Sequence, residues 1–384
     1  MNATMLATVG LTLSFVSVVD VAFAGGTATR PTVAWDRSAQ VTDGAYARVH
    51  RLQDGRFMCA YERAGNVWAR TAADPFGAWS EERLVAERPS AEVILANAEF
   101  VQLKSGRLLY GVNVRPRNRR IDRNPYAIGV VASDDAGTTW GPLQVVYRAE
   151  DRGDGVVRGC YEPFFLELPN GDVQLYFANE RPYVDGSHRY QEISVLTSGD
   201  GGSTWSAPRT ACYKPRCRDG MSTGVIEGDE ILLAIETNGK GERLHPEIVR
   251  TAVAEPWTSP VGFPSTDRIR PLGNRVDFSV VKGGAPYLVA TKSNLVLSWQ
   301  QAVPTAERPE GLRTVHLAVA ARNGVGEGRF VGDFTPPGLA GRQALWNSLC
   351  PLDDDAFLLV SEVRGRVVLN EGRIVREGHL AWGR

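Results

Sequence analysis

The sequence lacks an excess of charge of either sign. Its 384 residues include 43 Lys and Arg against 44 Asp and Glu, which gives a net charge of −1. A protein that binds nucleic acid or an anionic membrane surface carries a basic patch or stripe, and this balance offers none. The composition therefore predicts no nucleic-acid partner.

Cysteine and histidine are also scarce, with five residues of each type. The histidines are scattered, and the cysteines do not show the paired spacings of zinc sites. The sequence thus predicts no metal site and no cofactor. Cys212 and Cys217 bracket a short segment that could close as a local disulfide, whereas the other cysteines lie in apolar contexts that favour buried thiols.

Long apolar runs are missing except at the N-terminus. Residues 5–19 are apolar, and residues 22–24 read Ala-Phe-Ala, a small-residue cleavage signal. A membrane anchor is the rival interpretation, but it needs about 20 apolar residues, more than this run supplies. We expect residues 1–24 to be a signal peptide and residues 25–384 to form one secreted or periplasmic domain that does not associate with a membrane.

Amphipathic helical patterns are nearly absent, and short apolar runs that end in turns take their place, which is typical of an all-β protein. One unit recurs: a short strand, a turn with Gly or Asp, and an apolar strand that often ends in Glu. Its six copies start near residues 48, 99, 162, 221, 277 and 347. Units of about 60 residues fit four strands each, so the sequence predicts a six-bladed β-propeller, closed by residues 32–35 or 379–382.

Two turns share a second pattern. Residues 133–140 and 198–205 both read Ser-x-Asp-x-Gly-x-Thr-Trp. In such a turn the Asp caps backbone N–H groups, the Gly takes a left-handed conformation, and the Trp packs between blades. The pattern predicts turns between the outer strands of two blades, with a structural and not a catalytic role.

Propeller geometry places the chemistry on the opposite face. Residues that open the first strand of a blade share a rim with residues that end its second strand. The openers are Arg48, Glu99, Glu162, Asp219, Asp277 and Trp346, and the enders are Glu62, Glu180, Glu236 and Glu362. Glycosidic cleavage needs two carboxyl groups, and Glu162 and Glu236 are the predicted pair. The other glutamates are interpreted as polar rim residues.

The whole chain resembles the sialidase superfamily, whose Asp-boxes match the two turns, and more closely its exo-arabinanase branch. The segments that resemble this branch are residues 161–171, 219–221 leading to Glu236, 295–300 and 345–349. The resemblance implies a propeller that releases arabinobiose from the ends of α-1,5-L-arabinan with retention of configuration. It implies no cofactor, a polysaccharide or oligosaccharide as partner, and a monomer.

The resemblance makes Glu162 the nucleophile and Glu236 the general acid/base, but the roles can be exchanged, because sequence does not reveal which environment raises a pKa. The expected substrate-binding residues are Arg48, Asn97, Glu99, Tyr161, Glu180, Asp219, Trp299, Trp346 and Asn347. Five arginines in the segment 115–123 are either a contact for an anionic polysaccharide or part of a solvated loop.

True sialidases are the main alternative. They use a Tyr nucleophile and three arginines that clamp the substrate carboxylate. Arg48 and Glu162 match that family, but Trp346 stands in place of its Tyr, and the other two arginines have no clear counterpart. A polysaccharide lyase with His50 as the base and a non-catalytic glycan-binding propeller are further alternatives, because propellers host many functions.

Overall fold

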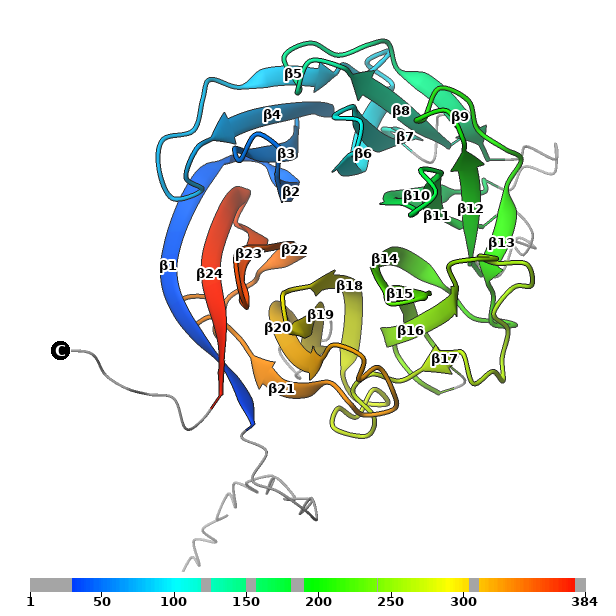
Figure 1. The fold of residues 1–384 in the computed structure, drawn as a ribbon, viewed down its shortest axis with the longest axis vertical. Helices are drawn as coiled ribbons and strands as arrows, with labels where there is room; N and C mark the ends of the chain where they lie inside the picture. Colours follow the sequence, from blue (N-terminus) through cyan, green and yellow to red (C-terminus); the bar gives the residue numbers. More distant parts are fainter. Residues whose placement is uncertain are drawn as a thin grey trace, which may run out of the picture.

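The computed structural model describes residues 30–118, 126–149, 157–180, 190–239, 241–303 and 311–376. These ranges form six four-stranded antiparallel sheets around a common axis (Figure 1). The predicted all-β six-bladed propeller is therefore confirmed. No helix capable of crossing a membrane occurs in the described ranges, and the predicted signal peptide lies outside them.

The first three blades are each built from consecutive strands, from the axis outward. Blade 1 consists of β2 (Ala45–Arg51), β3 (Phe57–Arg63), β4 (Asn66–Ala72) and β5 (Arg83–Ala86). Blade 2 consists of β6 (Val93–Gln102), β7 (Leu108–Pro116), β8 (Ala127–Ser133) and β9 (Gln144–Arg148). Blade 3 consists of β10 (Cys160–Glu167), β11 (Val173–Asn179), β12 (Glu192–Ser198) and β13 (Arg209–Cys212).

The next two blades follow the same plan, and the sixth borrows its outer strand from the start of the chain. Blade 4 consists of β14 (Gly220–Glu227), β15 (Glu230–Thr237), β16 (His245–Ala252) and β17 (Arg268–Ile269). Blade 5 consists of β18 (Lys282–Ala290), β19 (Asn294–Val303), β20 (Leu312–Ala321) and β21 (Val331–Phe334). Blade 6 consists of β22 (Leu345–Pro351), β23 (Ala356–Val363), β24 (Arg366–Arg376) and β1 (Pro31–Asp43).

The ring is closed by β1, which pairs antiparallel with β24 from Pro31 opposite Arg376 to Asp43 opposite Arg366 (Figure 1). Residues 32–35 thus take the first of the two closures expected from the sequence. The second, residues 379–382, lies outside the described residues.

The two Asp-box turns connect β8 to β9 and β12 to β13. In the first, Asp135 Oδ1 accepts the Thr139 N–H at 2.8 Å and Asp135 Oδ2 accepts the Thr139 hydroxyl at 2.6 Å. Trp140 packs on Tyr110 of the same blade with ring centroids 6.1 Å apart, and Trp205 packs on Phe165 at 6.2 Å. The turns therefore hold the outer strands through a capped backbone and an anchored indole.

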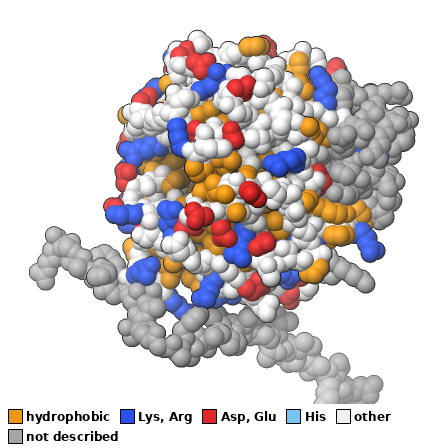
Figure 2. Space-filling view, turned by 45° about the vertical axis from the view of Figure 1, so that its right-hand side comes forward, with side chains coloured by type: hydrophobic (Ala, Val, Ile, Leu, Met, Phe, Trp, Pro, Cys, Tyr) orange, Lys and Arg blue, Asp and Glu red, His pale blue; other side chains and the backbone are white. Residues whose placement is uncertain are grey.

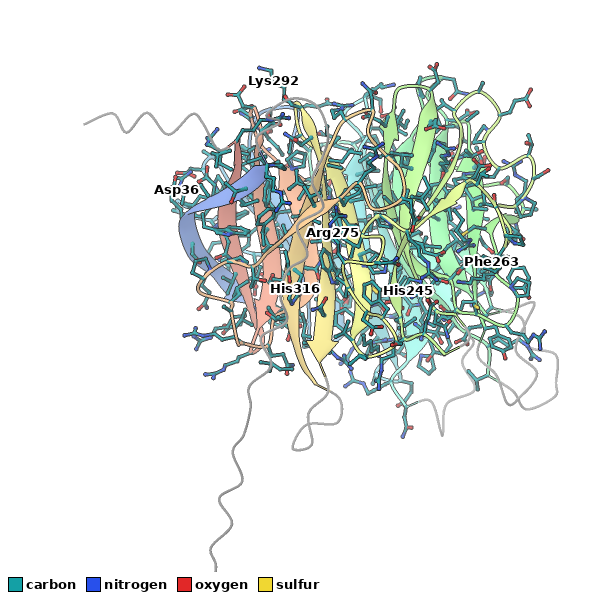
Figure 3. The ribbon with its side chains drawn as sticks, turned by 90° about the horizontal axis from the view of Figure 1, so that it is seen from below. Asp36, His245, Phe263, Arg275, Lys292 and His316 are labelled. Carbon is teal, nitrogen blue, oxygen red and sulfur yellow. The ribbon has the colours of Figure 1, made fainter. Side chains whose placement is uncertain are left out.

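The two faces of the ring are separated in the side view. Lys292, in the turn between β18 and β19 on the Asp-box face, lies at the upper edge of Figure 3, whereas His245, at the start of β16, lies in the lower half. Acidic and basic side chains are intermixed on the side drawn in Figure 2, in line with the balanced composition.

Every innermost strand carries the same irregularity. One residue per strand has a positive φ between 47° and 59°, and these residues are Tyr46, Asn97, Glu162, Met221, Ala285 and Trp346. In each blade the pairing with the second strand shifts register at this point. Such bulges bend a strand and redirect a side chain. The six left-handed residues, called here the bulge ring, occupy equivalent positions around the axis.

All five cysteines are free and buried, so the disulfide expected between Cys212 and Cys217 is not formed. Cys212 lies in β13 with its side chain in the core of blade 3. Cys217 follows a turn in which its N–H bonds the carbonyl of Lys214 at 3.1 Å. Close spacing in sequence was thus a poor guide to pairing here.

Candidate active site

The two predicted catalytic glutamates meet at one peptide of blade 4. Glu162, in the bulge of β10, accepts the Met221 N–H on Oε2 at 3.1 Å. Glu236, on β15, pairs across the sheet with Gly220, and a Cβ built on that glycine would lie 3.5 Å from Glu236 Oε1. Both carboxyl groups therefore border the Gly220–Met221 peptide.

A backbone contact from the next blade fixes Glu236. Its Oε2 accepts the N–H of Ala285, the bulge residue of β18, at 3.0 Å. The preceding Gly284 is essential to this approach, because a Cβ there would lie 2.7 Å from the same oxygen. Glu236 is 5% exposed, so its position is set by blades 4 and 5 together.

Arg218 supplies the positive charge of this site. Its Nη2 lies 3.5 Å from Glu236 Oε1, and its charge also acts on Glu162. Burial, together with the negative charge of Glu236, raises the pKa of Glu162 to about 7 against the opposing effect of Arg218. The pair can therefore hold one proton close to neutral pH.

The floor of the site is apolar. Tyr46, Met221 and Ala285 form a buried cluster against which Trp346 packs, and the Tyr46 and Trp346 ring centroids lie 5.4 Å apart. These residues come from four different blades, so they meet at the axis. Trp346 is only partly buried, which leaves an aromatic surface beside the carboxyl groups.

A third carboxyl group lies on the wall formed by blade 1. Burial raises the pKa of Glu62 to about 7, and the charge of Arg115 on blade 2 opposes this effect. Glu62 is partly exposed at the end of β3, on the rim where Glu236 ends its own strand.

Two residues that were expected to bind substrate are buried and paired with each other. Arg48 and Glu99 are each 3% exposed and form an ion pair, with Arg48 Nε 3.0 Å from Glu99 Oε2. Glu99 also accepts the Tyr287 hydroxyl at 2.9 Å, and its second oxygen lies 2.9 Å from His50 Nε2. The ion pair joins blades 1 and 2, which gives Arg48 and Glu99 a structural role, and their contact with substrate stays a prediction.

The expectation that Asp219 and Trp299 bind substrate is corrected, because both side chains are buried and bonded within the protein. Asp219 is fully buried, and its Oδ2 lies 2.7 Å from Arg268 Nη2. Trp299 is 1% exposed, packs in the core between blades 4 and 5, and donates its indole N–H to Gln301 at 3.1 Å. Neither side chain is available for stacking on, or bonding to, a sugar.

Glu180 and Asn347 are also buried and engaged. Glu180 Oε2 accepts the Gly159 N–H at 2.7 Å, and Asn347 Nδ2 donates to the Ser298 hydroxyl at 2.6 Å. Each is 3% exposed or less and supports the neighbouring strands, and contact of either residue with substrate stays a prediction.

Asn97 and Tyr161 lie nearer to the axis. Asn97 is the blade 2 member of the bulge ring, and Tyr161 precedes Glu162 and packs on Tyr126 with ring centroids 5.2 Å apart. Their contact with substrate stays a prediction. Of the arginine cluster, residues 119, 120 and 123 lie outside the described residues.

Sequence reasoning missed several residues of the site. Arg218 precedes Asp219 directly, and Tyr46, Met221 and Ala285 are the bulge-ring partners of Glu162. The repeat held the signal, since aligning all six copies on Glu162 would have identified the equivalent positions. Comparison of the first strands alone identified the bulge residue in blades 3 and 6, Glu162 and Trp346, and missed it as the opener in the other four blades.

No protein-family model and no curated protein matches this sequence. Solved structures do match it in fold. A GH93 α-L-arabinofuranosidase of Fusarium graminearum, in complex with arabinobiose, is 17% identical over 89% of this chain and 98% of its own, with a TM-score of 0.65. An α-L-arabinanase of Penicillium chrysogenum, also with arabinobiose, is 15% identical over 89% and 98%, with a TM-score of 0.64.

The fold is that of the arabinanase propellers. A Hadza microbial sialidase shares it too, at 12% identity over 88% of this chain and 68% of its own, with a TM-score of 0.59. The predicted resemblance to both branches is thus confirmed at the level of fold. In this propeller fold, the Glu162–Glu236 pair has the residue types that glycosidic cleavage requires.

Proposed function

We propose that this protein is an exported, exo-acting retaining glycoside hydrolase that cleaves α-1,5-L-arabinan. The observation that carries the proposal is the Glu162–Glu236 pair, two carboxyl groups that border one peptide at the axis and share the charge of Arg218. Similarity in fold to two enzymes solved with arabinobiose supports the choice of sugar.

The raised pKa of Glu162 supports one order of the two roles. Because burial and the charge of Glu236 raise the pKa of Glu162 to about 7, Glu162 is the group that holds the proton. It donates this proton to the leaving glycosidic oxygen while the Glu236 carboxylate attacks the anomeric carbon and forms an ester. Glu162 then takes a proton from water, which attacks the same carbon and frees Glu236. This order exchanges the roles that the family resemblance implies.

Product analysis on linear arabinan tests the proposal. Wild type should release arabinobiose, and both Glu162→Gln and Glu236→Gln should lower kcat by about 100-fold or more. Glu362→Gln, which removes a rim carboxyl group of blade 6, is the matched control and should retain activity. Absence of cleavage by wild type, or release of sialic acid from sialyl-lactose, would refute the arabinan assignment.

Azide separates the two roles. With an α-arabinoside that carries a good leaving group, azide should accelerate Glu162→Gln and give an α-linked azide, because azide displaces the Glu236 ester in a second inversion and configuration is retained. A β-linked azide from Glu162→Gln, with an α-linked azide from Glu236→Gln, would return the roles to the order implied by the resemblance.

A further inference from the structure

Glu62 occupies in blade 1 the position that Glu236 occupies in blade 4. Glu62 pairs with Ala45 directly before the bulge of β2, and Glu236 pairs with Gly220 directly before the bulge of β14. In a ring of six blades, blades 1 and 4 lie opposite each other. The two carboxyl groups therefore stand on opposing walls of the same site.

The two glutamates are also held in the same way. Each reaches the bulge of the following blade: Glu236 accepts the Ala285 N–H at 3.0 Å, and Glu62 accepts the Ala98 N–H at 3.4 Å. The contact of Glu62 is the longer one, and the side chain is partly exposed. Glu62 also accepts a hydrogen bond from the backbone of Asn97, and a carboxylate with about four acceptor positions keeps acceptor capacity beyond these two contacts.

Arg115 lies near the end of β7, opposite Ile94, and its charge acts on Glu62 although no bond joins the two side chains. The Arg115 side chain is half-buried and makes no ion pair or hydrogen bond within the described ranges. Its charge nevertheless acts on both Glu62 and Glu162. A half-buried guanidinium has five N–H donors, and leaving them unpaired is costly unless a ligand or water bonds them.

Together the Glu62 and Arg115 side chains offer a hydrogen-bond acceptor and a donor. A carboxylate accepts a hydroxyl proton and a guanidinium donates to a hydroxyl oxygen, so the combination fits two neighbouring hydroxyl groups of one sugar ring. A direct ion pair between Glu62 and Arg115 would leave fewer of their donors and acceptors available to a sugar. The aromatic surface of Trp346 on the floor completes a site with polar walls and an apolar base.

We propose that Glu62 and Arg115 form a subsite that binds vicinal hydroxyl groups of the sugar held between blade 1 and the Glu162–Glu236 pair. The inference rests on the proposed function for its ligand class, and it adds two residues that bind without taking part in bond cleavage. They determine affinity and orientation, and Glu162 and Glu236 carry out the chemistry.

Binding and turnover are measured separately to test this. Titration calorimetry with α-1,5-arabinotriose in the Glu162→Gln background reports binding without cleavage. Adding Glu62→Gln or Arg115→Ala should weaken binding about tenfold or more, as expected for loss of a charge-assisted hydrogen bond. In the otherwise wild-type enzyme, the same changes should raise KM by a similar factor and alter kcat by less than about threefold.

Glu362→Gln is the control, because Glu362 pairs with Leu345 at the same register position in blade 6 but has no neighbouring Arg115. Arg115→Lys, which keeps the charge, should recover part of the affinity, and thermal melting verifies that each variant folds. Equal affinity of the Glu62 and Glu362 variants, or a fall in kcat alone, would overturn the subsite. Failure of wild type to bind arabinotriose would overturn it as well.

The two proposals fail in different ways. If wild type cleaves arabinan and Glu62→Gln leaves KM unchanged, the function stands and the subsite is wrong. If arabinotriose binds, is not cleaved, and loses affinity on Glu62→Gln, the subsite stands and the hydrolase proposal is wrong.

Discussion

At the scale of single residues, the burial that raises the pKa of Glu162 also lowers the stability of the folded chain when Glu162 is ionised. Its pKa rises from an ordinary 4.5 to about 7 on folding, so the folded chain binds the proton more tightly than the unfolded chain. The contribution of Glu162 to stability is then highest below about pH 4.5 and decreases as the pH rises towards 7.

Glu162→Gln should therefore stabilise the protein above pH 7 while it removes activity. Each unit of pKa shift corresponds to about 1.4 kcal/mol, which gives an expected gain of about 1–3 kcal/mol at pH 8 and none at pH 4. Thermal melts of wild type and variant at both pH values measure this. A variant less stable than wild type at pH 8 would show that Glu162 is not strained by burial.

Substitution of Gly284 should affect catalysis without affecting folding. An added Cβ would lie 2.7 Å from Glu236 Oε2, the end of a side chain that can move aside. Gly284→Ala should therefore displace the carboxylate and lower kcat about 10-fold or more with little change in Tm. Kinetics and a melt on the same preparation test this. Gly338→Ala is the control, because Gly338 lies in the turn after β21, has no positive φ, and an added Cβ there meets nothing within 4 Å.

Loss of the buried ion pair between Asp219 and Arg268 should instead lower the stability of the fold. Asp219→Ala leaves a buried guanidinium without its closest carboxylate, which should cost about 3–5 kcal/mol of stability. Asp267→Ala removes a half-exposed partner of Arg250 and should cost less than about 1 kcal/mol. Urea unfolding of both variants makes the comparison, and equal losses would contradict the assignment of Asp219 to the core.

At the scale of elements, the strand repeat was predictable and the bulges were not. Glycine turns and apolar runs marked the first two strands of most blades in the sequence. A left-handed Tyr46, Met221 or Ala285 has no sequence signature, since non-glycine residues take this conformation only where surrounding structure forces it. Glu162 was predicted because its residue type carries chemistry, whereas Tyr46, Met221 and Ala285 were missed because theirs does not.

The Asp-box turns offer a test of structure against chemistry. Burial plays little part there: hydrogen bonds from the Thr204 hydroxyl and N–H lower the pKa of Asp200 to about 2. Asp200→Ala should lower Tm at neutral pH, and this difference should shrink as the pH falls from about 4 to 2, where wild type loses the same bonds. Activity per folded molecule should not change. A variant with altered kcat would give the box a role in catalysis.

At the scale of the whole molecule, the ring and the number of blades followed from the sequence, but the roles of its polar residues did not. Arg48 resembled a substrate clamp until its partner was known, and that partner, Glu99, is 51 residues away on the next blade. Asp219 finds Arg268 at a separation of 49 residues. Such pairings depend on how blades meet, which local patterns do not encode.

Because β1 closes the ring, deletion of this strand should destabilise the ring. Deleting residues 30–43 leaves β24 with an unpaired edge and removes apolar contacts of Val33 and Trp35, so the protein should aggregate or melt at a lower temperature. A chain starting at residue 30 keeps β1 and is the control. Size-exclusion chromatography and melting compare the two. A monomeric, equally stable deletion variant would show that the ring holds without its closing strand.

The same closure also sets an order of events in time. The strand made early has its partner made last, since Asp43 and its opposite residue Arg366 lie more than 300 positions apart. At translation rates of about 5–20 residues per second, β1 waits roughly 15–60 seconds for β24 to leave the ribosome. During that interval the nascent chain is an open arc in which β1 has no partner strand. A chaperone that shields β1 should therefore increase the yield of closed rings.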